Sequence, residues 1–205
     1  TGDGATNAQT FSGTTMSPNL VWIKNRDATD INCLFDTVRG ATELISSNDG
    51  DAEVTDADTL TSFDANGFTV DTDVKVNTNT EKYVSWNWNE SVTAGFDAVG
   101  YTGTGVARTV AHNLGVVPHF MCVRRYLSDG DSWRVYHHKN TAAPETDYLA
   151  LNTTAATADS NLMWNDTLPD ASNFTVGTAG SITSVQLNNS TTGNDMLTTV
   201  ITIDS

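Results

Sequence analysis

The sequence predicts an all-β protein made of two tandem antiparallel β-sandwich modules, jelly-roll-like and with long loops. Three observations favour this fold class. The 205 residues include 33 threonines, 20 aspartates and 19 asparagines but only five glutamates, and threonine favours strands whereas aspartate and asparagine favour turns. Apolar and polar side chains alternate with a period of two, as in strands with one buried face. A pattern of motifs recurs after about 100 residues, which is the size of one small β-sandwich.

The first module is expected to span residues 1–90, with apolar strands separated by turn residues. In its last strand Val84, Trp86 and Trp88 alternate with polar side chains, so these three should share one face. Turns are expected at 48–50 and at Asn66-Gly67, and a short helix at 56–60. The predicted strands cover residues 18–24, 33–36, 66–70 and 83–88.

The second module is expected to span residues 95–205 and to repeat the first. Its strands are expected at 118–124, 133–136, 172–176 and 197–203, and an alanine-rich stretch at 153–159 favours a second short helix. The segment Thr1-Gly2-Asp3-Gly4 recurs as Thr102-Gly103-Thr104-Gly105. The apolar string at 18–24 recurs at 118–124, and Asn-Gly-Phe-Thr-Val at 66–70 is echoed by Ser-Asn-Phe-Thr-Val at 172–176. We therefore expect Val21 to superpose on Met121 or its neighbour, and Phe68 on Phe174.

The second module also opens with a strand at 95–101 that has no counterpart in the first. The opening strand of the first module is therefore expected to be missing. The chain begins at Thr1, with neither an initiating methionine nor the apolar core of a signal peptide. We expect it to be part of a longer polypeptide.

The charge balance limits the classes of partner. Ten lysines and arginines stand against 25 aspartates and glutamates, which gives a net charge of −15. Nucleic-acid phosphates and anionic membrane surfaces would both be repelled, so neither is an expected partner. No apolar run approaches the roughly 20 residues of a membrane-spanning helix.

The two cysteines, Cys33 and Cys122, each lie inside an apolar stretch and lack the spacing of a zinc site. We expect two buried free thiols that pack as small apolar side chains. A disulfide between them is the alternative, and the sequence leaves it open.

Several strings in one order carry a family resemblance. They begin with Pro-Asn-Leu-Val-Trp-Ile-Lys-Asn-Arg at 18–26 and continue through residues 34–42, 60–68 and 83–88. This order resembles an uncharacterised domain of large virion proteins in marine bacteriophages, a domain that occurs in tandem copies opening with Tyr-Thr-Gly-polar-Gly, here residues 101–105. The second copy departs from the pattern, because Val-Tyr-His-His-Lys at 135–139 stands where the first copy has Phe-Asp-Thr-Val-Arg-Gly.

The resemblance implies a non-enzymatic virion structural protein, part of a tail fibre or host-attachment appendage. It implies other virion proteins and a host surface glycan or protein as partners, and a homo-oligomer, with a trimer favoured because several weak receptor contacts act together. A capsid decoration or outer head protein is one alternative. A carbohydrate-active enzyme on host glycan is another, although no nucleophile elbow, phosphate-binding loop or zinc-protease motif occurs, and no catalytic residue is predicted.

Aromatic side chains supply the candidate binding site. Trp133 and Trp164 adjoin polar turns, and Tyr148 lies between them in a loop-rich stretch. We predict that these three present an exposed face to a receptor, whereas Trp22, Trp86 and Trp88 fill a core. The alternative is that all three predicted contact rings are buried and both modules are spacers.

Charged and polar residues supply weaker candidates. The acidic loop with Asp49, Asp51, Asp56 and Asp58 is a candidate for Ca²⁺, and otherwise a solvated surface loop; no other cofactor is expected. His137 and His138 are adjacent, so alternation should point them to opposite faces and keep them out of one site. His112 and His119 are expected at polar surface or half-buried positions. Asp36 and Arg39 should form a local ion pair that fixes a turn.

Overall fold

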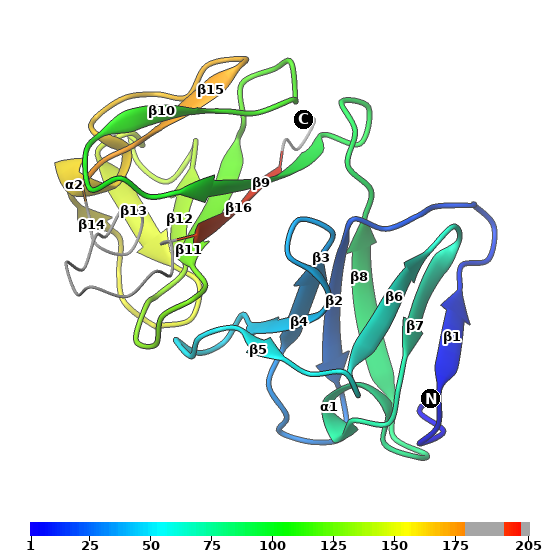
Figure 1. Cartoon of the computed structure of the whole chain (residues 1–205). Helices are drawn as coiled ribbons and strands as arrows, with labels where there is room; N and C mark the ends of the chain where they lie inside the picture. The colour runs from blue at the N-terminus through cyan, green and yellow to red at the C-terminus, as the bar shows by residue number, and fades with distance from the viewer. Residues whose placement is uncertain (179–194, 202–205) are drawn as a thin grey trace. The chain divides into compact units, whose positions relative to one another are not determined.

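The computed structural model describes residues 1–178 and the backbone of 195–201, and it confirms the predicted all-β, antiparallel fold class (Figure 1). The chain divides into two compact units, Thr1–Glu90 and Ser91–Ser205. The first unit has the bounds of the first predicted module, 1–90, and the second unit begins four residues before the second predicted module, 95–205. The last two residues of the strand expected at 197–203 lie outside the described residues.

The first unit is a sandwich of two antiparallel sheets. One sheet has the order β5-β4-β3-β2-β8 and the other the order β1-β7-β6. Buried side chains from both sheets form one core, including Val21 and Phe35 from the first and Phe68 and Val70 from the second. The elements are β1 (Asn7–Thr10), β2 (Leu20–Asn25), β3 (Cys33–Asp36), β4 (Gly40–Ser46), β5 (Val54–Thr55), β6 (Leu60–Asp64), β7 (Gly67–Val70), α1 (Val74–Asn77) and β8 (Tyr83–Trp88).

The second unit is also a sandwich of two antiparallel sheets, of orders β14-β13-β12-β11-β16-β9 and β10-β15. Its core joins Met121 and Tyr136 of the larger sheet to Phe174 and Val176 of the smaller. The elements are β9 (Phe96–Thr102), β10 (Arg108–Ala111), β11 (Phe120–Arg125), β12 (Arg134–His137), β13 (Asp147–Ala150), β14 (Ala158–Asp159), α2 (Asn161–Trp164), β15 (Asn173–Val176) and β16 (Asp195–Ile201).

The two units share a strand order. The order β5-β4-β3-β2-β8 is repeated as β14-β13-β12-β11-β16, and the pair β1-β7 as β10-β15. Val21 lies opposite Phe35, and Met121 lies opposite Tyr136. Phe68 and Phe174 likewise hold matching places on β7 and β15. These registers match the pairs expected from the sequence repeat, while descent of the two units from one module stays a prediction.

Both predicted helices are wrong. Residues 56–60 form a turn that enters β6, because the Asp56 carboxylate accepts the amide of Asp58 (3.1 Å) and so competes with helical bonding. Residues 153–159 are irregular up to β14, and three of them are threonines, which disfavour helix. In the described part of the chain no helix is long and apolar enough to cross a membrane.

Candidate functional site

The prediction that Trp133 and Trp164 lie on an exposed face is wrong. Trp133 and Trp164 are each only 1% exposed. The Trp164 ring packs edge-to-face on Tyr136 (centroids 6.1 Å apart), and its Nε1 donates to the Asp147 carbonyl at 3.0 Å. The Arg124 guanidinium lies 5.6 Å from the Trp133 ring centroid. The polar neighbours of these tryptophans in sequence gave no sign that Trp164, on α2, and Trp133, directly ahead of β12, would point inward.

Tyr148, the third member of the predicted face, is half-buried. It lies on β13 and packs against the core of the second unit. The Arg134 guanidinium is 5.0 Å from its ring centroid, an arrangement that attracts the cation to the ring face. The structure therefore brings Tyr148 close to the protein's own cation and does not bring three exposed rings together.

The exposed tryptophan lies in the other unit. Trp86 is 46% exposed, so its predicted place in the core is wrong, and Trp22 and Trp88 are half-buried. Trp22 and Trp86 lie directly opposite each other on β2 and β8, with ring centroids 5.6 Å apart. Val21 and Ile23 face the core, so strand alternation turns Trp22 and its partner outward.

Three of the four calcium candidates line one hollow. Asp49, Asp51 and Asp56 surround a space of about 140 Å³, whereas Asp58 is not in its lining. The Lys75 Nζ also reaches this hollow, 3.3 Å from the Asp56 carboxylate and 2.7 Å from that of Asp73. Burial disfavours the ammonium ion, but hydrogen bonds and charge from Asp73 and Asp56 outweigh burial and raise the pKa of Lys75.

The protein's own cation, the Lys75 ammonium group, therefore lines the acidic hollow. Within residues 1–178 and 195–201, no three histidines, cysteines or carboxylates are arranged to hold a metal ion. Calcium binding by the loop stays a prediction.

The histidines lie closer together than strand alternation predicts. The rings of His119 and His138 stack with centroids 4.0 Å apart, and the ring of His137 lies 5.3 Å from that of His138. The prediction that His137 and His138 diverge is wrong because β12 ends at His137, which frees His138 from the strand geometry. Burial, and then the charges of His119, His137 and Lys139, lower the pKa of His138.

The remaining histidine, His112, is buried and structural. Its Nε2 lies 3.1 Å from the Asp170 carbonyl oxygen, and its Nδ1 accepts the Leu114 amide at 3.3 Å. Both ring nitrogens thus hold loops together.

The Asp36–Arg39 pair is buried and belongs to a larger network. Arg39 Nε lies 2.7 Å from the Asp36 carboxylate, and its Nη1 lies 2.8 Å from Glu53. Arg39 also donates to the carbonyls of Glu43 (2.9 Å) and Leu34 (3.2 Å). Asp36 in turn accepts two backbone amides of its own turn. The network fastens the β3–β4 turn to residue 53 ahead of β5.

Both cysteines are free and buried. Burial raises the pKa of Cys33 to about 12, and it raises the pKa of Cys122 as well. Since the thiolate is the reactive form, neither cysteine has the character of a nucleophile.

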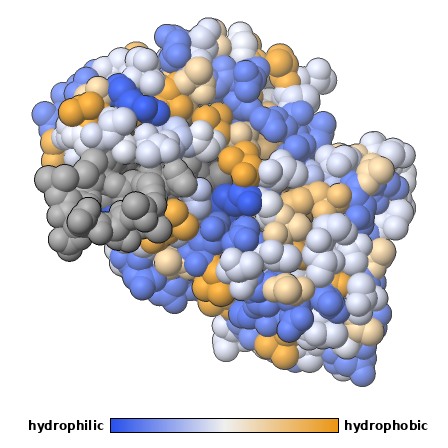
Figure 2. Space-filling model, viewed as in Figure 1, coloured by the Kyte–Doolittle hydropathy of each residue, from blue (hydrophilic) through white to orange (hydrophobic). Residues whose placement is uncertain are grey.

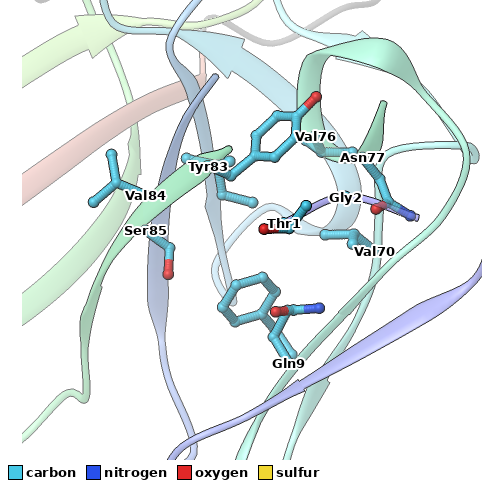
Figure 3. A pocket seen from close by; sticks show the side chains of 11 residues that line it. Thr1, Gly2, Gln9, Val70, Val76, Asn77, Tyr83, Val84 and Ser85 are labelled. Atoms are coloured by element: carbon cyan, nitrogen blue, oxygen red, sulfur yellow. The ribbon is translucent and has the colours of Figure 1, made fainter. Parts of the chain in front are cut away.

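A cavity of about 90 Å³ lies in the first unit (Figure 3). The labelled residues come from β8, β1, β7 and α1 and, in the case of Thr1 and Gly2, from the segment ahead of β1. The Tyr83 hydroxyl, at the β8 side, donates to the Val74 carbonyl at 2.7 Å and accepts the Thr78 amide at 2.9 Å. The lining consists of Thr1, Gly2, Gln9, Ile23, Phe68, Val70, Val76, Asn77, Tyr83, Val84 and Ser85.

Residues 1–198 match a family described as a domain of unknown function (DUF7483), and this match spans both units. No curated protein and no solved structure matches the chain. With almost its whole length covered, the chain belongs to the DUF7483 family.

Proposed function

We propose that this chain is a non-enzymatic structural component of a bacteriophage particle, part of a tail fibre or host-attachment appendage, in which its two units serve as spacers. The observation that carries the proposal is the repeated strand order of the two sandwiches. Repeated β modules extend an appendage without new chemistry in each unit. The sequence resemblance to virion proteins supplies the setting.

Loop fastening supports a spacer role. In the first unit Arg39 ties one turn down from inside, and Lys24 Nζ donates to the carbonyls of Ala28 (3.2 Å) and Asp30 (2.8 Å). In the second unit Arg125 pairs with Asp131 at 2.6 Å. Loops held in this way keep one conformation, which suits a rigid spacer more than an adaptable contact surface.

The burial of Trp133 and Trp164 supports the same role. Aromatic rings used for sugar binding need an accessible face, and these two rings are buried in the second unit. Receptor contact is therefore not assigned to these two tryptophans. Figure 2 shows hydrophobic residues in small groups among hydrophilic ones on the visible face, and the net charge of −15 favours solubility.

Labelled imaging of intact particles tests the location. A nanobody raised against the folded chain should decorate the tail or its fibres. Decoration of the head would favour the capsid alternative and overturn the appendage proposal, and absence of the chain from particles would overturn the virion role. Incubation of the chain with host-surface glycan should release no sugar; measured turnover would overturn the non-enzymatic assignment.

Light scattering on the complete appendage protein tests assembly. We expect a homo-oligomer, with three copies favoured, because symmetric fibres gain strength from several receptor contacts. A stable monomer at working concentration would count against the fibre.

A further inference from the structure

All four histidines of the chain lie in the second unit. They are His112, His119, His137 and His138, and the first unit, residues 1–90, contains no histidine. Histidine is the side chain whose ordinary pKa places its change of charge between about pH 5 and pH 8. Mild acid therefore charges histidines in the second unit only.

Three of these histidines meet at one corner, where β11 begins and β12 ends. The rings of His119 and His138 stack with centroids 4.0 Å apart and planes 18° from parallel, and the His137 ring lies 5.3 Å from that of His138. All three residues are half-buried. Two unit charges at the distance of the stacked rings repel enough to shift an equilibrium about fivefold in bulk water, and further at a protein surface.

The charges that act on His138 are all of one sign. Burial lowers its pKa first, and the charges of His119, His137 and Lys139 lower it further. His119 precedes β11, His137 ends β12, and Lys139 follows in the chain, so every element that meets at the corner contributes a group that becomes or is positive. The closed corner thus opposes a proton on His138.

The acids of the following segment act elsewhere. The Asp147 carboxylate accepts the Thr141 hydroxyl, and the charge of Glu145 acts on Tyr136. In the described part of the chain, no acid is among the groups that shift the pKa of His138. A protonated ring at the corner therefore gains no carboxylate that would offset its charge.

A second contact at the corner needs an unprotonated imidazole. His137 Nδ1 accepts the Lys139 amide at 3.2 Å, and an imidazolium ion has no acceptor nitrogen. The His138 amide also donates to the His119 carbonyl (2.9 Å), and the Asn140 amide donates to the His137 carbonyl (2.9 Å). The histidines therefore supply both the side-chain and the backbone acceptors for the segment after β12.

The first unit closes the same corner with two neutral side chains. The Thr37 amide donates to the Asn19 carbonyl at 2.9 Å, as the His138 amide does to His119, and Asn19 Nδ2 donates to the Thr37 hydroxyl at 3.1 Å. Neither of these side chains changes charge in mild acid. The Asn19–Thr37 corner is thus an internal control for the histidine corner.

His112 lies against an acid and is not part of this corner. Its Nε2 is 3.1 Å from the Asp170 carbonyl oxygen. Hydrogen bonds from the Ser172 and Asn173 amides lower the pKa of Asp170, and the charge of His112 lowers it further. A carboxylate in this position offsets a charge on His112, so protonation there brings no repulsion like that between stacked rings.

We propose that His119, His137 and His138 form an acid-sensitive latch, which holds the segment after β12 closed at neutral pH and releases it in mild acid. Because the closed corner disfavours charged rings, the open form binds more protons, and its population rises as the pH falls. The β11–β12 pairs from Met121 to Val123 contain no histidine, so the opening is confined to the corner. The latch does not depend on the proposed virion role, and it gives the second unit a response that the first unit lacks.

Amide hydrogen exchange on the full chain tests the latch. From about pH 7.5 to about pH 5, protection of the amides of residues 138–140 should fall about fivefold or more, after correction for the intrinsic exchange rate at each pH. Protection of the Thr37 amide should change less than about twofold, since no side chain of its corner pair titrates in this range. The variant H119N/H138T, which copies that pair, should lose the acid response.

Two single variants keep the test decisive if the double variant does not fold. His138→Gln keeps a polar side chain but removes one stacked ring, so the acid response should disappear. The matched control Lys139→Gln removes an exposed neighbouring charge and leaves the stack, so the response should remain. The proposal would be overturned by equal responses of these two variants, by a response retained in H119N/H138T, by an equal loss at Thr37, or by unchanged protection of 138–140 in the unsubstituted chain.

Discussion

The string Phe-Asp-Thr-Val-Arg-Gly at 35–40 supplies both Asp36 and Arg39, the two members of a buried ion pair in the first unit. Moving an ion pair out of water is costly, and it is tolerated where hydrogen bonds satisfy the remaining polar atoms. Arg39 has both carboxylate partners and two carbonyl acceptors, and its side chain is 1% exposed. In the second unit His137 holds the place of Asp36, opposite Phe120 as Asp36 is opposite Leu20. The second turn therefore cannot use the same network.

Replacing Arg39 by alanine should destabilise the first unit strongly. The change leaves the buried Asp36 and the half-buried Glu53 without their cation, and we expect a loss of about 3–5 kcal/mol in the free energy of unfolding. The matched control is Lys75→Ala, which removes ion pairs of a side chain that is 28% exposed and should cost only about 0–1 kcal/mol. Urea unfolding followed by fluorescence measures both. Similar small losses would show that the buried network contributes no more than a surface pair.

His119 and His138, whose rings stack, hold the places that Asn19 and Thr37 hold in the first unit. In the first unit Thr37 donates its amide to the Asn19 carbonyl at 2.9 Å, as His138 does to His119, and the Asn19 side chain donates to the Thr37 hydroxyl. Histidine at both places puts two titratable rings where the first unit has two neutral side chains. This corner of the second unit should respond to pH.

His138 should titrate below the usual histidine value of about 6.5, because burial and neighbouring positive charge lower its pKa. The unfolded chain then binds the proton more readily than the folded chain. Stability that is present above pH 6.5 is lost as the pH falls through the lowered pKa. NMR titration of the ring carbon protons measures this, and His119→Asn should raise the pKa of His138. A pKa of His138 at or above 6.5 in the unsubstituted chain would contradict the expectation.

At the scale of elements, the β6–β7 hairpin depends on one glycine. Gly67 has φ +122°, and a Cβ there would fall on the Gln9 carbonyl of the paired strand β1. The Asn66 side chain holds the same corner, donating to the Phe11 carbonyl at 3.1 Å and accepting the Met16 amide at 3.2 Å. The three-stranded sheet therefore packs its backbones too closely for any side chain at this position.

Gly67→Ala should cost several kcal/mol, because it adds a steric collision to backbone strain. Gly40→Ala is the matched control, since Gly40 has φ +116° with no atom near an added Cβ. Strain alone should cost about 1–3 kcal/mol. Thermal unfolding compares the two variants. If they lose equal stability, the close approach of β1 to Gly67 is not a constraint on the fold.

At the scale of the whole molecule, each unit has its own sheets and its own core. The core clusters of the two units share no residue, so a local change should act on one unit. Arg39→Ala should lower the temperature of the calorimetric transition of the first unit and leave that of the second unchanged within about 1 °C. The reason is that every contact given for the Arg39 side chain lies within the first unit. Equal shifts of both transitions would show that the units unfold together.

The sequence by itself determined the all-β class and most strands of the described chain. Alternation with period two and turn residues such as Asn66-Gly67 are local signals, and they locate strands without knowledge of any partner. The repeat of the string at 18–24 as 118–124 also predicted matching positions such as Val21 and Met121.

Only the tertiary structure decided which face of each strand is covered and which side chains meet. Alternation gives Trp86 and Trp133 a face, but a second sheet or a helix decides whether that face is buried. The same limit applies to the corner of His119 and His138 and to the cavity beside β8, which join residues distant in sequence. Burial and proximity follow from packing between strands, and packing is a property of the whole fold that no local pattern contains.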